Sequence, residues 1–149
     1  MNKSAVLGTL ALVFATAVMA ATPADVIAAR QANFKTMGGA FKAIIDELRN
    51  PSPDIAVIRA KAPALAVAAG HVGGFFPAGT GTEAGVKTGA LPEIWQRNDE
   101  FHRDADNLAA VTRTFQAAAE SGDLDRIKAA LPAVGGACKT CHDSFRARS

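Results

Sequence analysis

Residues 137–142, ACKTCH, hold both cysteines of the chain and one of its three histidines. Two thiols three residues apart, followed at once by an imidazole, suit three chemistries: covalent attachment of haem, a redox-active disulfide, or part of a zinc site. On a helix, Cys138 and Cys141 would lie one turn apart on one face. They could then meet the two vinyl groups on one edge of a porphyrin, and His142 could reach the iron from one side.

The rest of the chain favours the first of these chemistries. A thioredoxin-like disulfide belongs to a βαβ unit, and no strand-like alternation of useful length is present. A zinc site needs four ligands, and beyond the motif only His71 and His102 could supply a histidine. We read both as surface residues, because each lies one position away from the apolar row of its helix. The motif therefore predicts one haem c, attached through Cys138 and Cys141, with His142 as the metal ligand.

The first twenty residues have the pattern of a secretory signal peptide. Lys3 supplies a positive start, an apolar run follows over 5–17, and small residues stand at Val18 and Ala20. We expect cleavage after Ala20, or one residue later, and a mature single domain over 21–149. The segment is too short and wrongly flanked to span a bilayer. It predicts export to the periplasm, with no membrane attachment after cleavage.

Charge gives no argument for a nucleic-acid or anionic-membrane partner. The formal net charge is +2 for the whole chain, and removal of Lys3 leaves +1. A near-neutral surface lacks the broad positive field that attracts polyanions.

Four segments carry hydrophobic residues at helical spacing, over about 23–49, 55–72, 93–121 and 123–145. Each begins with a capping signal, Pro or Asp. The long segment 73–92 is rich in Gly, Thr and Pro and reads as a loop. Pro63 should kink or split its helix, and a bend is expected near Pro132 and the pair Gly135 and Gly136. The first and second predicted helices are joined by a short link, and so are the third and fourth. These links predict an all-α, antiparallel up-down-up-down four-helix bundle.

The first of these segments suggests what faces the iron opposite His142. Its apolar row contains Arg30, a charge in a seam that needs an anion, and haem propionates would supply one. Phe34, one turn on, would then lie over the ring and cannot ligate iron, which predicts a five-coordinate metal. Two alternatives stay open: Arg30 extends to solvent with Phe34 in the core, or the helix shifts by one turn and Met37 binds the iron.

The mature chain resembles the cytochrome c′ family over nearly its full length. The resemblance rests on ARQANFKTMGGAFKAI in the first helix, FFPAGTG and LPEIW in and after the loop, SGDLD between the last two helices, and CKTCHDSFR at the end. It implies a periplasmic, often dimeric, high-spin haem protein that binds nitric oxide and carbon monoxide. It also implies that Arg146 lies near the proximal haem face, Arg30 near a propionate, and Phe34 at the distal position. Low-spin relatives have Met at the Phe34 position, and Leu is commoner there among gas-binding members.

Two functions remain as hypotheses. The first is reversible binding of NO and CO by five-coordinate haem, with a role in NO handling. The second is one-electron transfer to a periplasmic redox partner, with Met37 or a histidine as the sixth ligand. An enzymatic role is not expected, because the predicted distal face shows no acid–base group. A homodimer through the first two helices is expected, with close approach at Ala28, Ala29, Ala32, Ala66 and Ala68.

Overall fold

The computed structural model describes residues 21–148, so the predicted signal peptide lies outside the described residues. Four long helices make up most of this part of the chain: α1 (Pro23–Leu48), α2 (Ile55–Gly70), α4 (Asn98–Ser121) and α5 (Leu124–Phe145). The long connection between α2 and α4 contains two 3₁₀ turns, η1 (Val72–Phe75) and η2 (Thr82–Ala84), and one short helix, α3 (Glu93–Gln96).

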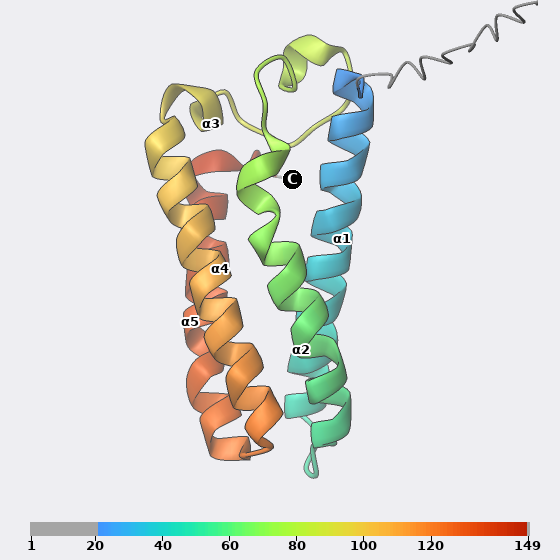
Figure 1. Ribbon diagram of the computed structural model, residues 1–149, viewed down its shortest axis with the longest axis vertical. Helices are drawn as coiled ribbons and strands as arrows, with labels where there is room; N and C mark the ends of the chain where they lie inside the picture. Colours follow the sequence, from blue (N-terminus) through green and yellow to red (C-terminus); the bar gives the residue numbers. More distant parts are fainter. Residues whose placement is uncertain (1–20, 149) are drawn as a thin grey trace, which may run out of the picture.

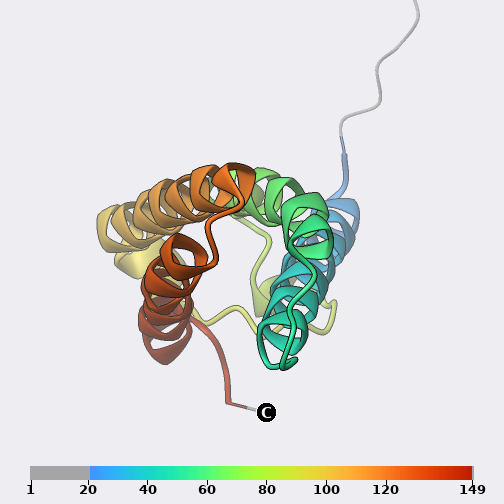
Figure 2. The ribbon, with the colours of Figure 1, turned by 90° about the horizontal axis from the view of Figure 1, so that it is seen from below.

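The four long helices form the antiparallel bundle that the sequence predicts (Figure 1). α1 packs along α2, α2 along α4, and α4 along α5. The fourth side is different, because α1 and α5 diverge and the long connection passes between them (Figure 2). The bundle is therefore closed on three sides and open on the side between its first and last helices.

Side-chain caps confirm three of the four predicted helix starts, those of α1, α2 and α5. Thr22 and Asp25 form a capping box at α1, in which the Asp25 amide donates to Thr22 Oγ1 (3.2 Å) and the Thr22 amide to Asp25 Oδ2 (3.0 Å). Asp54 and Asp123 cap α2 and α5. Gly122 ends α4 with a φ of 73°, a left-handed conformation that favours glycine.

Two predicted boundaries were wrong. The helices α2 and α5 both continue through their prolines, Pro63 and Pro132, so the split that was one of two outcomes expected at Pro63 does not occur. Both prolines are exposed, so the carbonyl that each leaves unbonded can face water. α2 ends at Gly70, after which the chain continues as a 3₁₀ turn. The third predicted helix is broken at Arg97 (φ −118°, ψ 46°), where its side chain pairs with Glu100 in the first turn of α4.

The core follows the predicted heptad spacing along the bundle. The buried residues include Ile58 and Leu65 on α2, and Phe101, Leu108 and Phe115 on α4. Two residues expected on an outer face, Ala66 and Ala68, are buried instead, whereas Ala28, Ala29 and Ala32 are exposed. α2 is almost wholly apolar, so its sequence does not reveal which side faces outward.

Within residues 21–148, none of the helices combines the length and the hydropathy that crossing a bilayer requires.

Candidate haem site

A cavity of about 550 Å³ opens on the side of the bundle where α1 and α5 diverge. Its volume is in the range of small-molecule and cofactor sites. The structure brings together in its wall all six residues predicted from the sequence to form the site. These are Arg30, Phe34, Cys138, Cys141, His142 and Arg146.

The two cysteines line this cavity from α5, one turn apart, as free thiols. Burial raises the pKa of both, and that of Cys141 reaches about 11, with smaller contributions from the Asp104 carboxylate and Cys138. Redox-active cysteine pairs have a lowered pKa, because the thiolate is the reactive form. The raised pKa of the two thiols is the opposite of what a disulfide-exchange centre requires.

The zinc alternative lacks ligands. No cluster of three or more His, Cys, Asp or Glu side chains suited to a metal occurs in the described part of the chain. His71 and His102 are exposed and do not line the cavity. His71 instead packs its ring edge-on against Phe75 (6.4 Å between ring centroids).

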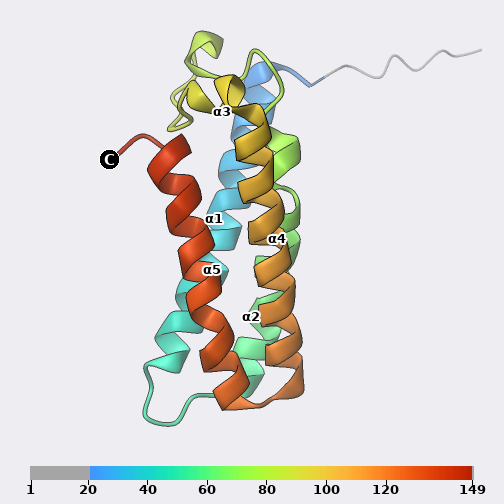
Figure 3. The same cartoon turned by 90° about the vertical axis from the view of Figure 1, so that its left-hand side faces the viewer.

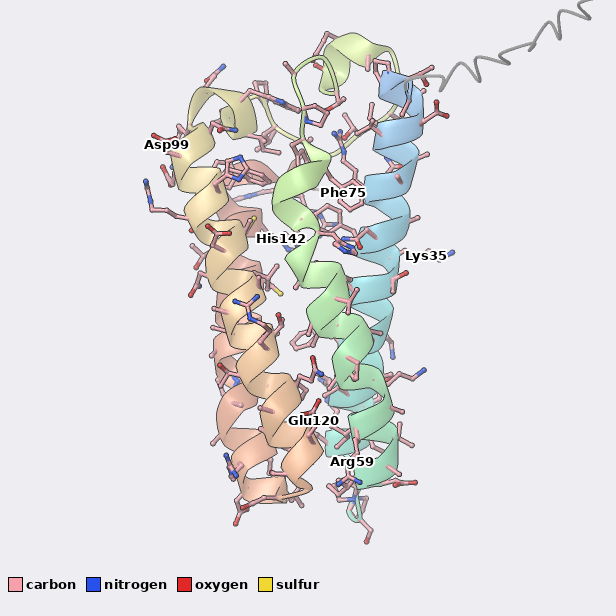
Figure 4. The ribbon with its side chains drawn as sticks, viewed as in Figure 1. Lys35, Arg59, Phe75, Asp99, Glu120 and His142 are labelled. Atoms are coloured by element: carbon pink, nitrogen blue, oxygen red, sulfur yellow. The ribbon has the colours of Figure 1, made fainter. Side chains whose placement is uncertain are left out.

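His142 stands at the rim of the cavity, in the upper half of the bundle (Figure 4). Partial burial of the ring lowers the pKa of His142. The Arg146 guanidinium, one turn further on, makes a smaller contribution in the same direction. Both effects favour neutral imidazole near pH 7, which is the form that binds metals.

Arg30 is a buried cation in the opposite wall, only 2% exposed. Its Nη1 donates to Thr80 Oγ1 (3.1 Å) and its Nη2 to Thr88 Oγ1 (2.7 Å), and its Cζ lies 4.7 Å from the ring centroid of Phe76. Burial lowers the pKa of Arg30, and only the more distant Glu83 opposes this. Arg30 therefore does not extend to solvent, and within residues 21–148 it forms no ion pair.

A buried guanidinium with only neutral contacts is costly, so this wall of the cavity suits an anion. The two ends of the cavity thus carry different chemical groups. Two thiols and an imidazole lie on α5, and a buried cation lies on α1, with apolar side chains between them. A haem has the matching groups, namely two vinyls, an iron and two propionates, and the residues present fit it.

The register of α1 against α5 decides what lies opposite His142. Two links relate the two helices. A Cβ on Gly135 would lie 3.9 Å from Phe41 Cζ, and the segment after Lys87 joins Arg30 to Arg146. Between these links each helix runs eleven residues, in opposite directions. Phe34 is seven residues from Phe41 on α1, and His142 is seven residues from Gly135 on α5.

Met37 lies three residues further along α1, about 4.5 Å away along the helix axis at 1.5 Å per residue. Its side chain is buried and also lines the cavity. Both candidates for the distal position, Phe34 and Met37, therefore line the cavity.

Three residues that contact Arg30, of which Phe76 and Thr88 line the cavity, were not identified as site residues from the sequence. Phe76 packs on Phe34 (6.3 Å between ring centroids) and on Phe101 (4.8 Å), and lies under the Arg30 guanidinium. Thr80 and Thr88 hold that guanidinium. All three belong to an irregular loop with no periodicity to reveal which side chains turn inward. The sequence indicated only that Arg30 lies in an apolar row and so needs hydrogen-bond acceptors. It did not indicate which residues provide them.

A four-helix bundle with C-x-x-C-H on its last helix defines a c-type haem protein of bundle architecture. Comparison with known proteins narrows the class: the family model for cytochrome c′ matches residues 25–146. The chain belongs to the cytochrome c′ family, whose members carry one covalently bound haem c.

Individual relatives agree with this assignment. Cytochrome c′ of Rubrivivax gelatinosus is 34% identical over 124 residues, which cover 83% of this chain and 95% of the relative. Cytochrome c′ of Rhodopseudomonas palustris is 38% identical over 125 residues and 83% of each chain. The crystal structure of the Thermochromatium tepidum protein superposes with a TM-score of 0.81 at 31% identity, covering 86% of this chain and 98% of that one.

Another similar structure is a nitric oxide complex of a variant cytochrome c prime from Alcaligenes xylosoxidans. Its TM-score is 0.76 at 30% identity, over 86% of this chain and 98% of that one.

Proposed function

We propose that this chain is a periplasmic haem protein with five-coordinate iron that binds NO and CO and takes part in NO handling. Cys138 and Cys141 hold the haem through thioether bonds, and His142 is the one axial ligand from the protein. Arg30 neutralises a propionate at the opposite end, and Arg146 lies beside the proximal face. The haem supplies an iron with a free position for a diatomic gas.

The observation that supports the proposal is that Phe34 lines the cavity from α1, while Cys138, Cys141 and His142 line it from α5. A phenyl ring has no lone pair to donate, so it leaves the second axial position of the iron without a protein ligand. The ring is half-buried and packed against Phe76, which keeps the distal side apolar.

The apolar distal wall also favours particular gases. Bound O₂ is stabilised by hydrogen-bond donors in the distal pocket, whereas NO and CO need less of this help. Phe34, Met37 and Phe41 offer no such donor. The wall of the cavity contains no carboxylate, and its one histidine is His142. Gas binding is therefore better supported than acid–base catalysis at this site.

Titration of the ferrous protein with CO and with NO tests the proposal. We expect both gases to bind saturably, with one gas per chain and a change in the Soret band. Failure of both gases to bind to a ferrous, haem-loaded protein would contradict it.

One observation favours a second candidate, a one-electron carrier with six-coordinate iron. Met37 is buried and lines the same cavity, so a local shift of α1 would bring its sulfur towards the iron. Met37→Leu conserves volume and removes the sulfur. We expect no change in the resting spectra, because the proposal places Phe34, and not Met37, opposite His142. A conversion from low spin to high spin in this variant would instead establish the second candidate.

We also infer export and self-association. Export rests on the signal peptide predicted for residues 1–20. A homodimer is supported by the exposed small residues Ala28, Ala29 and Ala32 on α1 and by Val67 on α2, which is 59% exposed. A solved cytochrome c′ with a TM-score of 0.79 and 28% identity, covering 87% of this chain, shows ligand-controlled dimer dissociation. Sedimentation at micromolar concentration, with and without CO, tests this.

A further inference from the structure

The open side of the bundle is crossed by a short piece of the long connection, residues 87–91, which we call the strap. On one side it binds α1: Gln31 Nε2 donates to the Lys87 carbonyl (2.9 Å) and Arg30 Nη2 to Thr88 Oγ1 (2.7 Å). On the other side it pairs with the end of α5. The Ala147 amide donates to the Gly89 carbonyl (2.9 Å), and the Leu91 amide to the Phe145 carbonyl (3.1 Å). Figure 3 shows the end of α5 reaching this connection at the top of the bundle.

The hydroxyl oxygen of Thr88 connects the part of the strap that binds α1 to the part that pairs with α5. Thr88 Oγ1 accepts from Arg30 Nη2 and also from the Ala90 amide (3.1 Å), two residues along the chain. Ala90 is the residue that forms the isolated antiparallel bridge with Arg146. The hydroxyl of Thr88 thus links a side chain of α1 to the backbone that pairs with α5.

On the α5 side, the strap pairs with the residues that directly follow the turn of His142, the proposed iron ligand. The Arg146 amide donates to the His142 carbonyl (3.3 Å), so the backbone held by the strap is continuous with the turn of His142. Because α1 and α5 pack poorly against each other directly, few other contacts fix the distance between Arg30 and this turn.

We propose that Thr88 is a positioning residue that sets the separation of the two haem-facing walls, by tying Arg30 on α1 to the His142 turn of α5. The haem part of this inference rests on the proposed function, whereas the mechanical part concerns only the chain. Thr80, the other hydroxyl that binds Arg30, has a different role, because it donates to the Pro77 carbonyl and stays within the loop.

Three variants of the haem-loaded protein test the proposal. Thr88→Val keeps the shape of the side chain and removes the acceptor, while Thr88→Ser keeps the hydroxyl. Thr82→Val is the matched control, since Thr82 lies in the same connection and its exposed side chain makes no hydrogen bond in residues 21–148. The measurements are amide hydrogen exchange at Leu91 and Ala147 and the midpoint potential of the haem.

In Thr88→Val we expect exchange at Leu91 and Ala147 to be about tenfold faster, as loss of one charge-assisted hydrogen bond implies. We also expect the potential to fall, because a less restrained Arg30 leaves the oxidised haem with less opposing positive charge. Thr88→Ser and Thr82→Val should match the wild type in both measurements.

Unchanged exchange at both amides in Thr88→Val would overturn the proposal. So would an equal acceleration throughout α2 and α4, because that pattern would indicate a general loss of stability. If the iron of every variant proves six-coordinate, the proposed function fails, but the exchange comparison still decides the role of Thr88.

Discussion

Replacing Phe34 by alanine should open the distal side of the iron and raise the affinity for CO. The Phe34 ring is half-buried, lines the cavity, and packs on Phe76 at 6.3 Å between ring centroids. In the proposed function, a gas that binds the iron opposite His142 would have to displace this ring. Alanine removes the ring and with it the need for that movement.

The size of the effect follows from the displacement. Moving a side chain about 30° from its preferred rotamer costs about 0.5–1.5 kcal/mol, which corresponds to an affinity gain of about two- to tenfold when that cost is removed. The variant should also lose stability. Full burial makes Phe→Ala cost about 3–5 kcal/mol, and a half-buried ring facing a cavity should cost about 1–2 kcal/mol.

Flash photolysis of the CO complex measures the association and dissociation rates separately. We expect the gain mainly in association, because the ring blocks the approach to the iron. Phe41→Ala is the matched control: Phe41 lines the same cavity from α1, but about 10 Å further along the helix axis. If CO affinity rose in Phe41→Ala and not in Phe34→Ala, the register that places Phe34 opposite His142 would be refuted.

Three further predictions concern other parts of the site and the fold. The double variant Cys138→Ser/Cys141→Ser should lose covalent haem, so that acid–acetone extraction removes all colour from the protein, whereas the wild type keeps it. Arg30→Met should lower both the thermal midpoint and the haem potential, because Thr80 and Thr88 lose their donor and the propionate end loses its cation; an unchanged potential would exclude a propionate contact. Hydrogen bonds from Thr22 lower the pKa of Asp25, so its stabilising effect is present at neutral pH and is lost as the pH falls below about 4. The difference in thermal midpoint between the wild type and Asp25→Asn should therefore shrink between pH 6 and pH 3, and a constant difference would contradict this.

The fold was largely predictable from the sequence because its signals are local. Heptad spacing, the capping pair Thr22 and Asp25, and Gly122 at a helix end each depend on residues within a turn or two of one another. The break at Arg97 was not predictable in the same way, since the seven-residue spacing from Ile94 to Phe101 continues across it. Likewise, the apolar sequence of α2 did not reveal that Ala66 and Ala68 face inward.

Residues of the candidate site could be predicted where they form a motif of fixed spacing, or where a charged residue interrupts an apolar row. Cys138, Cys141 and His142 form a motif, and Arg30 interrupts an apolar row. The contacts that hold Arg30 come from an irregular loop fifty or more residues away, and no periodicity indicated Thr80 or Thr88. What lies opposite His142 also depends on how α1 and α5 sit across the cavity, and no local pattern in either helix gives that arrangement.

The central claim is that the chain supplies one axial ligand to the haem iron and leaves the other position free. The visible spectrum of the ferrous protein without added ligand tests this most directly. Five-coordinate iron predicts a single broad band in the α/β region that changes on addition of CO. A split, narrow pair of α and β bands in the resting ferrous protein, unchanged by CO, would show a second protein ligand and contradict the claim.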